Sequence, residues 1–150
     1  MRLVIQRVRE ASVTIGGHTV SAIGHGLLIL VGVEQDDTEA DCRYLAAKAV
    51  ALRIFDDDRG VMNRSVVDIE GDVLAVSQFT LLASTRKGNR PSYIRAAGHE
   101  LATRLYQMFI DETSRLLGRP TLAGVFGADM QVSLVNDGPV TILIDSRNSQ

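Results

Sequence analysis

Ser77-Gln78-Phe79-Thr80 places two hydroxyls and an amide within four residues, at the end of a predicted strand. Short polar side chains gathered at a strand end are what a small polar binding pocket needs. A strand that buries Val76 and Phe79, while its hydroxyls satisfy backbone groups, explains the same residues without any function. The segment is therefore a candidate site that needs support from elsewhere in the chain.

Two further segments carry groups that a site can use. Residues 85–91, Thr-Arg-Lys-Gly-Asn-Arg-Pro, form the one dense basic stretch of the sequence, and cations on such a loop can position a phosphate backbone. Asn136-Asp137-Gly138-Pro139 is typical of a tight turn between two apolar strands. A cis bond before Pro139, a state of ~5% of X–Pro bonds in folded proteins, would turn two successive carbonyls to the same side, where they can hold an ammonium group.

Several common kinds of site have no support in the sequence. The three histidines, at positions 18, 25 and 99, fall in different predicted elements without ligand spacing. A single cysteine, Cys42, cannot form a disulfide within the chain or a thiolate-rich metal site. Walker, dinucleotide-binding and Gly-x-Ser-x-Gly patterns are missing. We therefore expect neither a metal nor a cofactor.

Length and composition predict one globular domain over residues 1–150, with 45% hydrophobic and 23% charged residues. The net charge of −2 argues against a strongly basic nucleic-acid binder, and we expect no DNA partner. The longest apolar run, residues 27–33, is far below the ~20 residues of a membrane helix, and no secretory signal is recognisable. The sequence thus predicts a cytoplasmic protein without a membrane partner.

Hydrophobic periodicity predicts the elements that must position these residues. Strands are predicted over residues 4–14 and 18–23, joined at Gly16-Gly17, and over residues 27–33, 72–82, 131–135 and 140–144. Helices are predicted from about residue 36 to 52 and from 93 to 117. This order favours an α+β fold, in which two helices pack against a mostly antiparallel sheet.

Taken together, these segments resemble the D-aminoacyl-tRNA deacylases, the D-tyrosyl-tRNA deacylase family. The resemblance runs from residue 1 to about 145 and rests on MRLVIQRV at 1–8, MNRS at 62–65, SQFTL at 77–81, TRKGNRPS at 85–92 and GVFGADMQVSLVNDGPVT at 124–141. SQFTL followed by NDGPVT at this separation is a highly specific combination. The resemblance implies a barrel-like set of antiparallel strands with helices outside, in a homodimer whose two active sites lie at the interface.

The resemblance also implies an activity, the hydrolysis of the ester in D-aminoacyl-tRNA, which is a chiral proofreading step in translation. The family's catalytic motif corresponds here to Ser77, Gln78, Phe79 and Thr80. Gly138 and Pro139 correspond to a Gly-cis-Pro turn that reaches into the partner subunit's site and excludes L-aminoacyl esters. The remaining site residues are Arg7, which would hold that turn, and Phe126 and Met130, the two ends of the Phe-Gly-Ala-Asp-Met stretch that would lie beside the pocket. Candidates for the tRNA backbone are Arg86, Lys87 and Arg90.

Two mechanisms fit these residues. Ser77 or Thr80 can act as a nucleophile, although neither has a histidine or carboxylate close by in the sequence and the fold would have to supply one. Alternatively, backbone amides near Phe79 and Thr80 stabilise the oxyanion, and the terminal ribose 2′-hydroxyl orients the attacking water. We favour the second mechanism. Because glycine has no side chain to exclude, some cleavage of glycyl-tRNA is also expected.

Two other functions account for part of the sequence. A non-catalytic dimer that binds tRNA or protein through residues 86–90 would leave SQFTL and the Gly-Pro turn unexplained. An animal-type relative that removes mischarged L-amino acids is expected to differ in SQFTL and to hold its Gly-Pro bond trans. The presence of SQFT together with Arg7 favours the D-specific branch.

Overall fold

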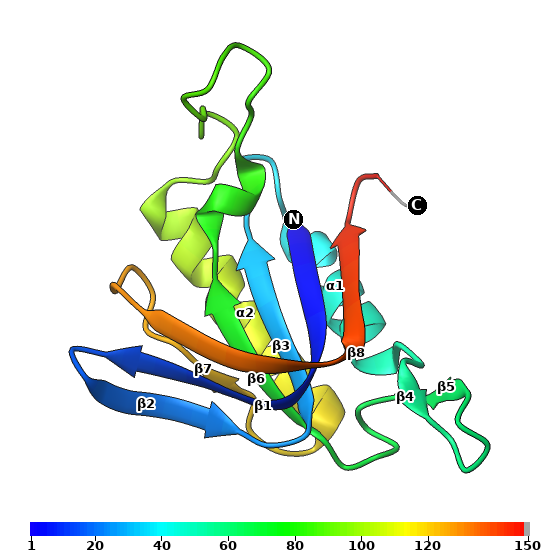
Figure 1. Ribbon diagram of the computed structural model, residues 1–150. Helices are drawn as coiled ribbons and strands as arrows, with labels where there is room; N and C mark the ends of the chain where they lie inside the picture. The colour runs from blue at the N-terminus through cyan, green and yellow to red at the C-terminus, as the bar shows by residue number, and fades with distance from the viewer. Residues whose placement is uncertain (149–150) are drawn as a thin grey trace.

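The computed structural model describes residues 1–148, so the last two residues of the predicted 1–150 domain lie outside the described part. Figure 1 shows a strongly curved sheet with both long helices on one of its faces. The elements are β1 (Arg2–Ile15), β2 (His18–Ile23), β3 (Gly26–Gly32), α1 (Glu39–Ala51), β4 (Phe55–Asp56), β5 (Met62–Arg64), β6 (Asp72–Ser77), the 3-10 helix η1 (Phe79–Leu82), α2 (His99–Leu117), β7 (Leu122–Ala123) and β8 (Gln131–Asp145).

Strand β1 organises the main sheet because it has three partners. Its first half pairs antiparallel with β3, its second half pairs antiparallel with β2, and β8 runs antiparallel along nearly its whole length. Strand β6 adds to β3 in parallel, and β7 adds to β6 in parallel. The predicted α+β fold, with a mostly antiparallel, barrel-like sheet and two helices outside, is therefore confirmed.

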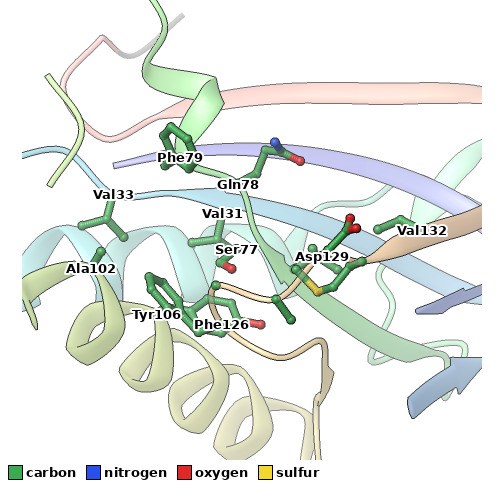
Figure 2. A pocket seen from close by; sticks show the side chains of 14 residues that line it. Val31, Val33, Ser77, Gln78, Phe79, Ala102, Tyr106, Phe126, Asp129 and Val132 are labelled. Carbon is green, nitrogen blue, oxygen red and sulfur yellow. The ribbon is translucent and has the colours of Figure 1, made fainter. Parts of the chain in front are cut away.

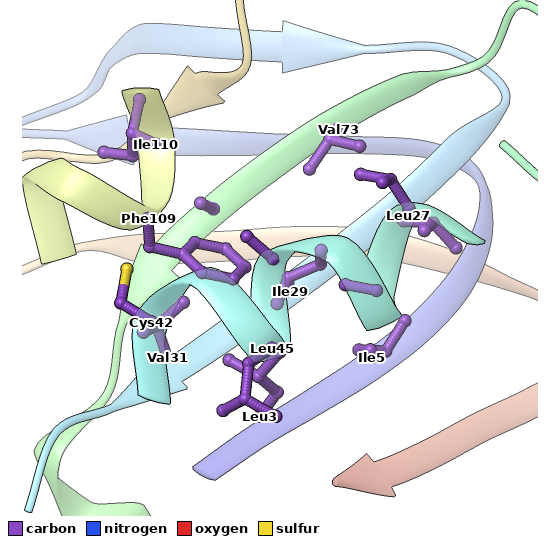
Figure 3. Close-up of a cluster of buried hydrophobic side chains, with 14 of the residues drawn as sticks. Leu3, Ile5, Leu27, Ile29, Val31, Cys42, Leu45, Val73, Phe109 and Ile110 are labelled. Atoms are coloured by element: carbon purple, nitrogen blue, oxygen red, sulfur yellow. The ribbon is translucent and has the colours of Figure 1, made fainter. Parts of the chain in front are cut away.

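Two apolar clusters lie on opposite faces of the curved sheet. The larger one packs α1 and α2 against the sheet, with Leu45 and Phe109 among the helix residues and Ile29 among the strand residues (Figure 3). The smaller one lies inside the curve and includes Leu28 and Val76. Neighbouring residues of β3 thus enter different clusters, which explains why its sequence is continuously apolar.

The segment Asn136–Pro139 differs from the predicted turn. Between the pairs Gln6↔Thr141 and Val8↔Asn136, β1 advances by two residues while β8 advances by five. Both halves of β8 run antiparallel to the same strand, so the chain does not reverse here. The segment is a large bulge in one continuous strand, and it projects from the sheet at the point where the ladder is interrupted.

Two predicted boundaries also move. The strand predicted over residues 72–82 ends at Ser77, and the chain then turns into η1. The second helix begins at His99 rather than at residue 93, because residues before it are fixed to the end of β3 instead. The Ala97 amide donates to the Val33 carbonyl at 2.9 Å, and Arg95 forms an ion pair with Glu34 at 2.5 Å. Across the described residues, neither long helix has the apolar length that crossing a membrane requires.

Candidate active site

A cavity of about 340 Å³ lies at the carboxyl end of β6, between the sheet and α2 (Figure 2). Five of the residues predicted for the site line it, namely Ser77, Gln78, Phe79, Phe126 and Met130. They come from two segments almost fifty residues apart, which the fold brings to one place. Thr80 follows directly in η1, whereas the other predicted site residues lie elsewhere on this chain.

The SQFT segment is held by the neighbouring strand. Ser77, the last residue of β6, pairs with Val31 of β3, and the Gln78 amide donates to the Val31 carbonyl at 2.8 Å. Beyond this bond the chain leaves the sheet and enters η1. The Gln78 side-chain amide then donates to the Thr80 hydroxyl, which links the two polar residues of the turn.

Gly32 allows η1 to close over the end of β3. A Cβ at this position would lie 2.7 Å from Leu82 Cδ2 and 3.1 Å from the Gln78 carbonyl oxygen, so a side chain would push η1 away. Phe79 and Thr80 consequently occupy the first turn of η1, where backbone amides have no earlier carbonyl of the same helix to bond. These are the amides that the sequence suggested as oxyanion donors.

In the part of the chain that the structure describes, no base is hydrogen-bonded to either candidate nucleophile. Within residues 1–148, neither the Ser77 hydroxyl nor the Thr80 hydroxyl is hydrogen-bonded to a histidine or a carboxylate. An activated serine or threonine normally has such a partner within hydrogen-bond reach. In the same described range there is also no cluster of three or more His, Cys, Asp or Glu side chains that could hold a metal ion.

Tyr106 of α2 forms part of the cavity wall and was missed by sequence reasoning. Its hydroxyl donates to the Ala75 carbonyl at 2.9 Å, and burial raises the pKa of Tyr106 to about 12. Phe126 packs against it with ring centroids 5.8 Å apart. A tyrosine among the apolar positions of a helix was the available signal, because a buried hydroxyl needs a partner across the core.

The basic loop follows the cavity-lining residue Phe79 along the chain. Phe79 is 57% exposed and packs edge-to-face on Tyr93, with ring centroids 5.0 Å apart. Between these aromatic residues the chain forms a long projecting loop (Figure 1), closed at its base by two hydrogen bonds between the backbones of Ser84 and Ser92. Its exposed cations form no ion pair with any described residue; they are Arg86, Lys87 and Arg90.

Arg7 lies beneath the bulge of β8, away from the cavity. It is 8% exposed, and its Nε donates to the Asp137 carbonyl at 2.8 Å. The Gly138-Pro139 bond is cis, and both residues are exposed. Gly138 has φ +137°, and a Cβ there would lie 3.0 Å from Arg7 Nη2 and 2.8 Å from Val140 Cγ2. Only glycine fits this position without a shift of its neighbours.

Asn136 closes the bulge and was also missed. Its Oδ1 accepts from the Val140 amide at 2.7 Å, and its Nδ2 donates to the Val140 carbonyl at 3.2 Å. One side chain thus replaces the ladder bonds that the bulge interrupts. The signal was an asparagine ahead of Asp-Gly-Pro, since asparagine side chains commonly bond the backbone of a nearby turn.

Comparisons with known proteins agree across almost the whole chain. The family model described as D-Tyr-tRNA(Tyr) deacylase matches residues 4–145. The chain is similar to proteins named D-aminoacyl-tRNA deacylase from Opitutus terrae, with 63% identity over 97% of both chains, and from Porphyromonas gingivalis, with 61% identity over 100% of both. A solved structure of a c-Myc DNA Unwinding Element Binding Protein superposes with a TM-score of 0.92 at 40% identity, covering 97% of this chain and 98% of that one.

Proposed function

Because the chain belongs to the D-Tyr-tRNA(Tyr) deacylase family, we propose that it hydrolyses the ester of D-aminoacyl-tRNA as a proofreading enzyme of translation. The observation that carries this function is similarity over the full length to proteins named D-aminoacyl-tRNA deacylase. In the reaction a water oxygen bonds to the ester carbonyl carbon, and the bond from that carbon to the ribose oxygen breaks. The ribose oxygen takes up a proton, and the products are a D-amino acid and tRNA.

We place the scissile ester in the cavity, against the SQFT segment. The amides of Phe79 and Thr80 would stabilise the oxyanion, because the first turn of η1 leaves them without helical acceptors. The terminal ribose 2′-hydroxyl would orient the attacking water, since Ser77 and Thr80 have no histidine or carboxylate bonded to them within residues 1–148. The protein then contributes by positioning the ester and by excluding other orientations of the bound substrate.

Chiral selection is proposed to come from a second copy of the chain. Gly138 and Pro139 are exposed on the bulge and do not line the cavity of their own chain. In a homodimer they would enter the partner's cavity, where their carbonyls hold the α-amino group and block the direction of an L side chain. Arg7 supports this role because its hydrogen bond to the Asp137 carbonyl fixes the residue before Gly138.

The projecting loop is proposed to contact the tRNA backbone. Its three cations, Arg86, Lys87 and Arg90, are exposed and lie on the chain between Phe79, which lines the cavity, and Tyr93, which packs on Phe79. Phosphate contacts of this kind position a nucleic acid without reading its sequence.

A cytoplasmic location is proposed together with the deacylase function, because charged tRNA is used where translation occurs.

The proposed function is tested by deacylation of D-tyrosyl-tRNA and L-tyrosyl-tRNA with the purified protein after treatment with EDTA. We expect rapid loss of the D ester, no effect on the L ester and slower cleavage of glycyl-tRNA. Loss of neither ester, with the protein folded, would favour a binding module. Cleavage of both tyrosyl esters would leave a deacylase without the proposed chiral exclusion.

A further inference from the structure

Asp129 is the one residue among the fourteen described lining residues of the cavity that carries a formal charge at neutral pH. Figure 2 shows its side chain on the part of the wall away from α2. The residue is exposed, and within residues 1–148 its carboxylate makes neither an ion pair nor a hydrogen bond. A carboxylate at the wall of a cavity with no protein cation beside it is available to a cation of the ligand.

The local chain holds Asp129 at a defined place. The preceding residues form a turn in which the Ala128 amide donates to the Val125 carbonyl at 3.1 Å. The following residue, Met130, packs against the apolar cluster inside the curved sheet. Asp129 is thus fixed between a closed turn and a residue anchored in that cluster, although its own side chain faces solvent and the cavity.

The negative charge of Asp129 acts differently on the two ends of an aminoacyl-tRNA. The nucleic-acid part of such a substrate carries negative charge on its phosphates, and a carboxylate repels it. The α-ammonium group, next to the scissile ester, is the cation that every aminoacyl ester brings to the cavity. A negative wall therefore favours the aminoacyl end of the substrate over its phosphates.

We infer that Asp129 is a substrate-binding residue that recognises the α-ammonium group of the aminoacyl ester. This inference rests on the proposed function and deepens it, because it adds a full negative charge from the same chain to the two carbonyls proposed to come from the partner. Those carbonyls are dipoles of fixed direction. A carboxylate acts over a longer range and distinguishes an ammonium group from an uncharged group of equal size.

A general-base role would use the same carboxylate differently. A base must lie within hydrogen-bond reach of the proton that it takes. In the described chain Asp129 bonds to neither candidate hydroxyl, that of Ser77 or that of Thr80. Asp129 is therefore not a base for either hydroxyl, and a base acting on the attacking water is the alternative that the experiment below separates from binding. The two roles differ in a measurable way, since a base acts on every ester whereas an ammonium site acts only on esters that carry the ammonium group.

The test compares two D esters of the same tRNA, D-tyrosyl-tRNA and its isostere with an α-hydroxyl in place of the α-ammonium group. Initial rates are measured with the full-length wild-type protein, with Asp129→Asn and with Asp129→Glu. Asp111→Asn serves as the matched control, because it removes one exposed charge from α2 outside the cavity. Unfolding curves of each variant show that it is folded at the assay temperature.

We expect Asp129→Asn to raise KM for D-tyrosyl-tRNA by roughly fivefold to tenfold, as for one partly solvated charge-assisted contact, with kcat changed by less than about threefold. The α-hydroxy ester should show no such increase, and Asp129→Glu should recover most of the loss. An equal loss of kcat on both esters would overturn the inference in favour of a base, and unchanged KM values would overturn it outright. If the wild-type protein leaves D-tyrosyl-tRNA intact, the proposed function itself fails, which is a separate outcome.

Discussion

The guanidinium of Arg7 donates its Nε–H to the backbone carbonyl of Asp137 across 2.8 Å. Its Nη1 donates to the Ile54 carbonyl at 2.7 Å, so one buried side chain ties the bulge of β8 to the segment just before β4. The Asp137 carboxylate adds its charge at 3.6 Å from Arg7 Nε. The planar guanidinium of Arg7 therefore fixes Asp137, the residue before Gly138, by donating to two backbone carbonyls at once. Arginine provides this geometry and lysine does not.

Replacement of Arg7 by lysine should release the bulge. Loss of one charge-assisted hydrogen bond at this buried site should lower the free energy of unfolding by about 1.5–3 kcal/mol, and discrimination between D-tyrosyl-tRNA and L-tyrosyl-tRNA should fall. Urea unfolding and initial rates on both esters measure the two effects. Arg43→Lys is the control, because its i,i+4 pair with Glu39 is exposed and worth less than about 0.5 kcal/mol. A folded Arg7→Lys protein with intact discrimination would contradict the positioning role.

Gly138→Ala tests the same segment through its backbone. The added Cβ would meet Val140 Cγ2 at 2.8 Å and Arg7 Nη2 at 3.0 Å, at a φ of +137° that L side chains rarely adopt. We expect the activity on D-tyrosyl-tRNA to fall at least tenfold while the protein stays folded, because the clash lies on an exposed bulge. Gly24→Ala, where a Cβ meets nothing within 4 Å, should retain full activity. Equal activity of the two variants would remove Gly138 from the site.

The sequence predicted those elements whose signal is local. The hairpin around Gly16-Gly17, the apolar strand β3 and the core of both helices each follow from the spacing of apolar residues over a few turns or pairs. The bulge of β8 did not follow, because two apolar stretches around Asn-Asp-Gly-Pro have the same pattern whether the chain reverses or continues. Only the long-range pairing of both stretches with β1 decides between them.

The parts of the candidate site that lie in short local segments were also predictable from the sequence, and the parts that depend on long-range packing were not. The SQFT segment was correctly expected at a strand end, and five of the predicted site residues share one cavity. Tyr106 was missed because its place in that cavity depends on how α2 packs, which the spacing of residues along the chain does not encode. Asp129 belongs to the stretch that the resemblance placed beside the pocket, but no role was predicted for its side chain. The resemblance to a family, and not periodicity, pointed to Arg7 as the neighbour of the bulge.

Thr80→Ala separates the two mechanisms. If the ribose 2′-hydroxyl orients the water, the threonine hydroxyl contributes only its hydrogen bond with Gln78, and kcat should fall no more than a few-fold. Single-turnover assays with radiolabelled D-tyrosyl-tRNA measure this step. Complete loss of activity, together with an acyl-enzyme trapped from the parent protein, would establish Thr80 as the nucleophile and reject the substrate-assisted mechanism.

The projecting loop should act through charge alone. A variant with glutamine at Arg86, Lys87 and Arg90 should raise KM for D-tyrosyl-tRNA and make its dependence on salt shallower, by roughly 0.7–0.9 in log–log slope for each phosphate that the loop no longer neutralises. The D-tyrosyl ester of adenosine lacks the tRNA body, so its hydrolysis should be unchanged. Equal losses on both substrates would mean that the loop shapes the cavity and does not contact tRNA.

Tyr106→Phe tests whether the phenol in the cavity wall is structural. The wild-type hydroxyl bonds to the Ala75 carbonyl, and its removal should lower the free energy of unfolding by about 0.5–1.5 kcal/mol. Burial raises the pKa of Tyr106 to about 12, above its usual value of about 10. The folded state therefore favours the protonated phenol, so this stabilisation is fully present below about pH 10 and declines as the pH rises toward 12. Unfolding curves should show a constant difference between wild type and variant from pH 6 to 9 and a smaller one above pH 10.

Because the phenol stays protonated in the working range, kcat/KM should have the same pH dependence in both proteins. A basic limb below pH 9 that disappears in Tyr106→Phe would show instead that the hydroxyl takes part in proton transfer.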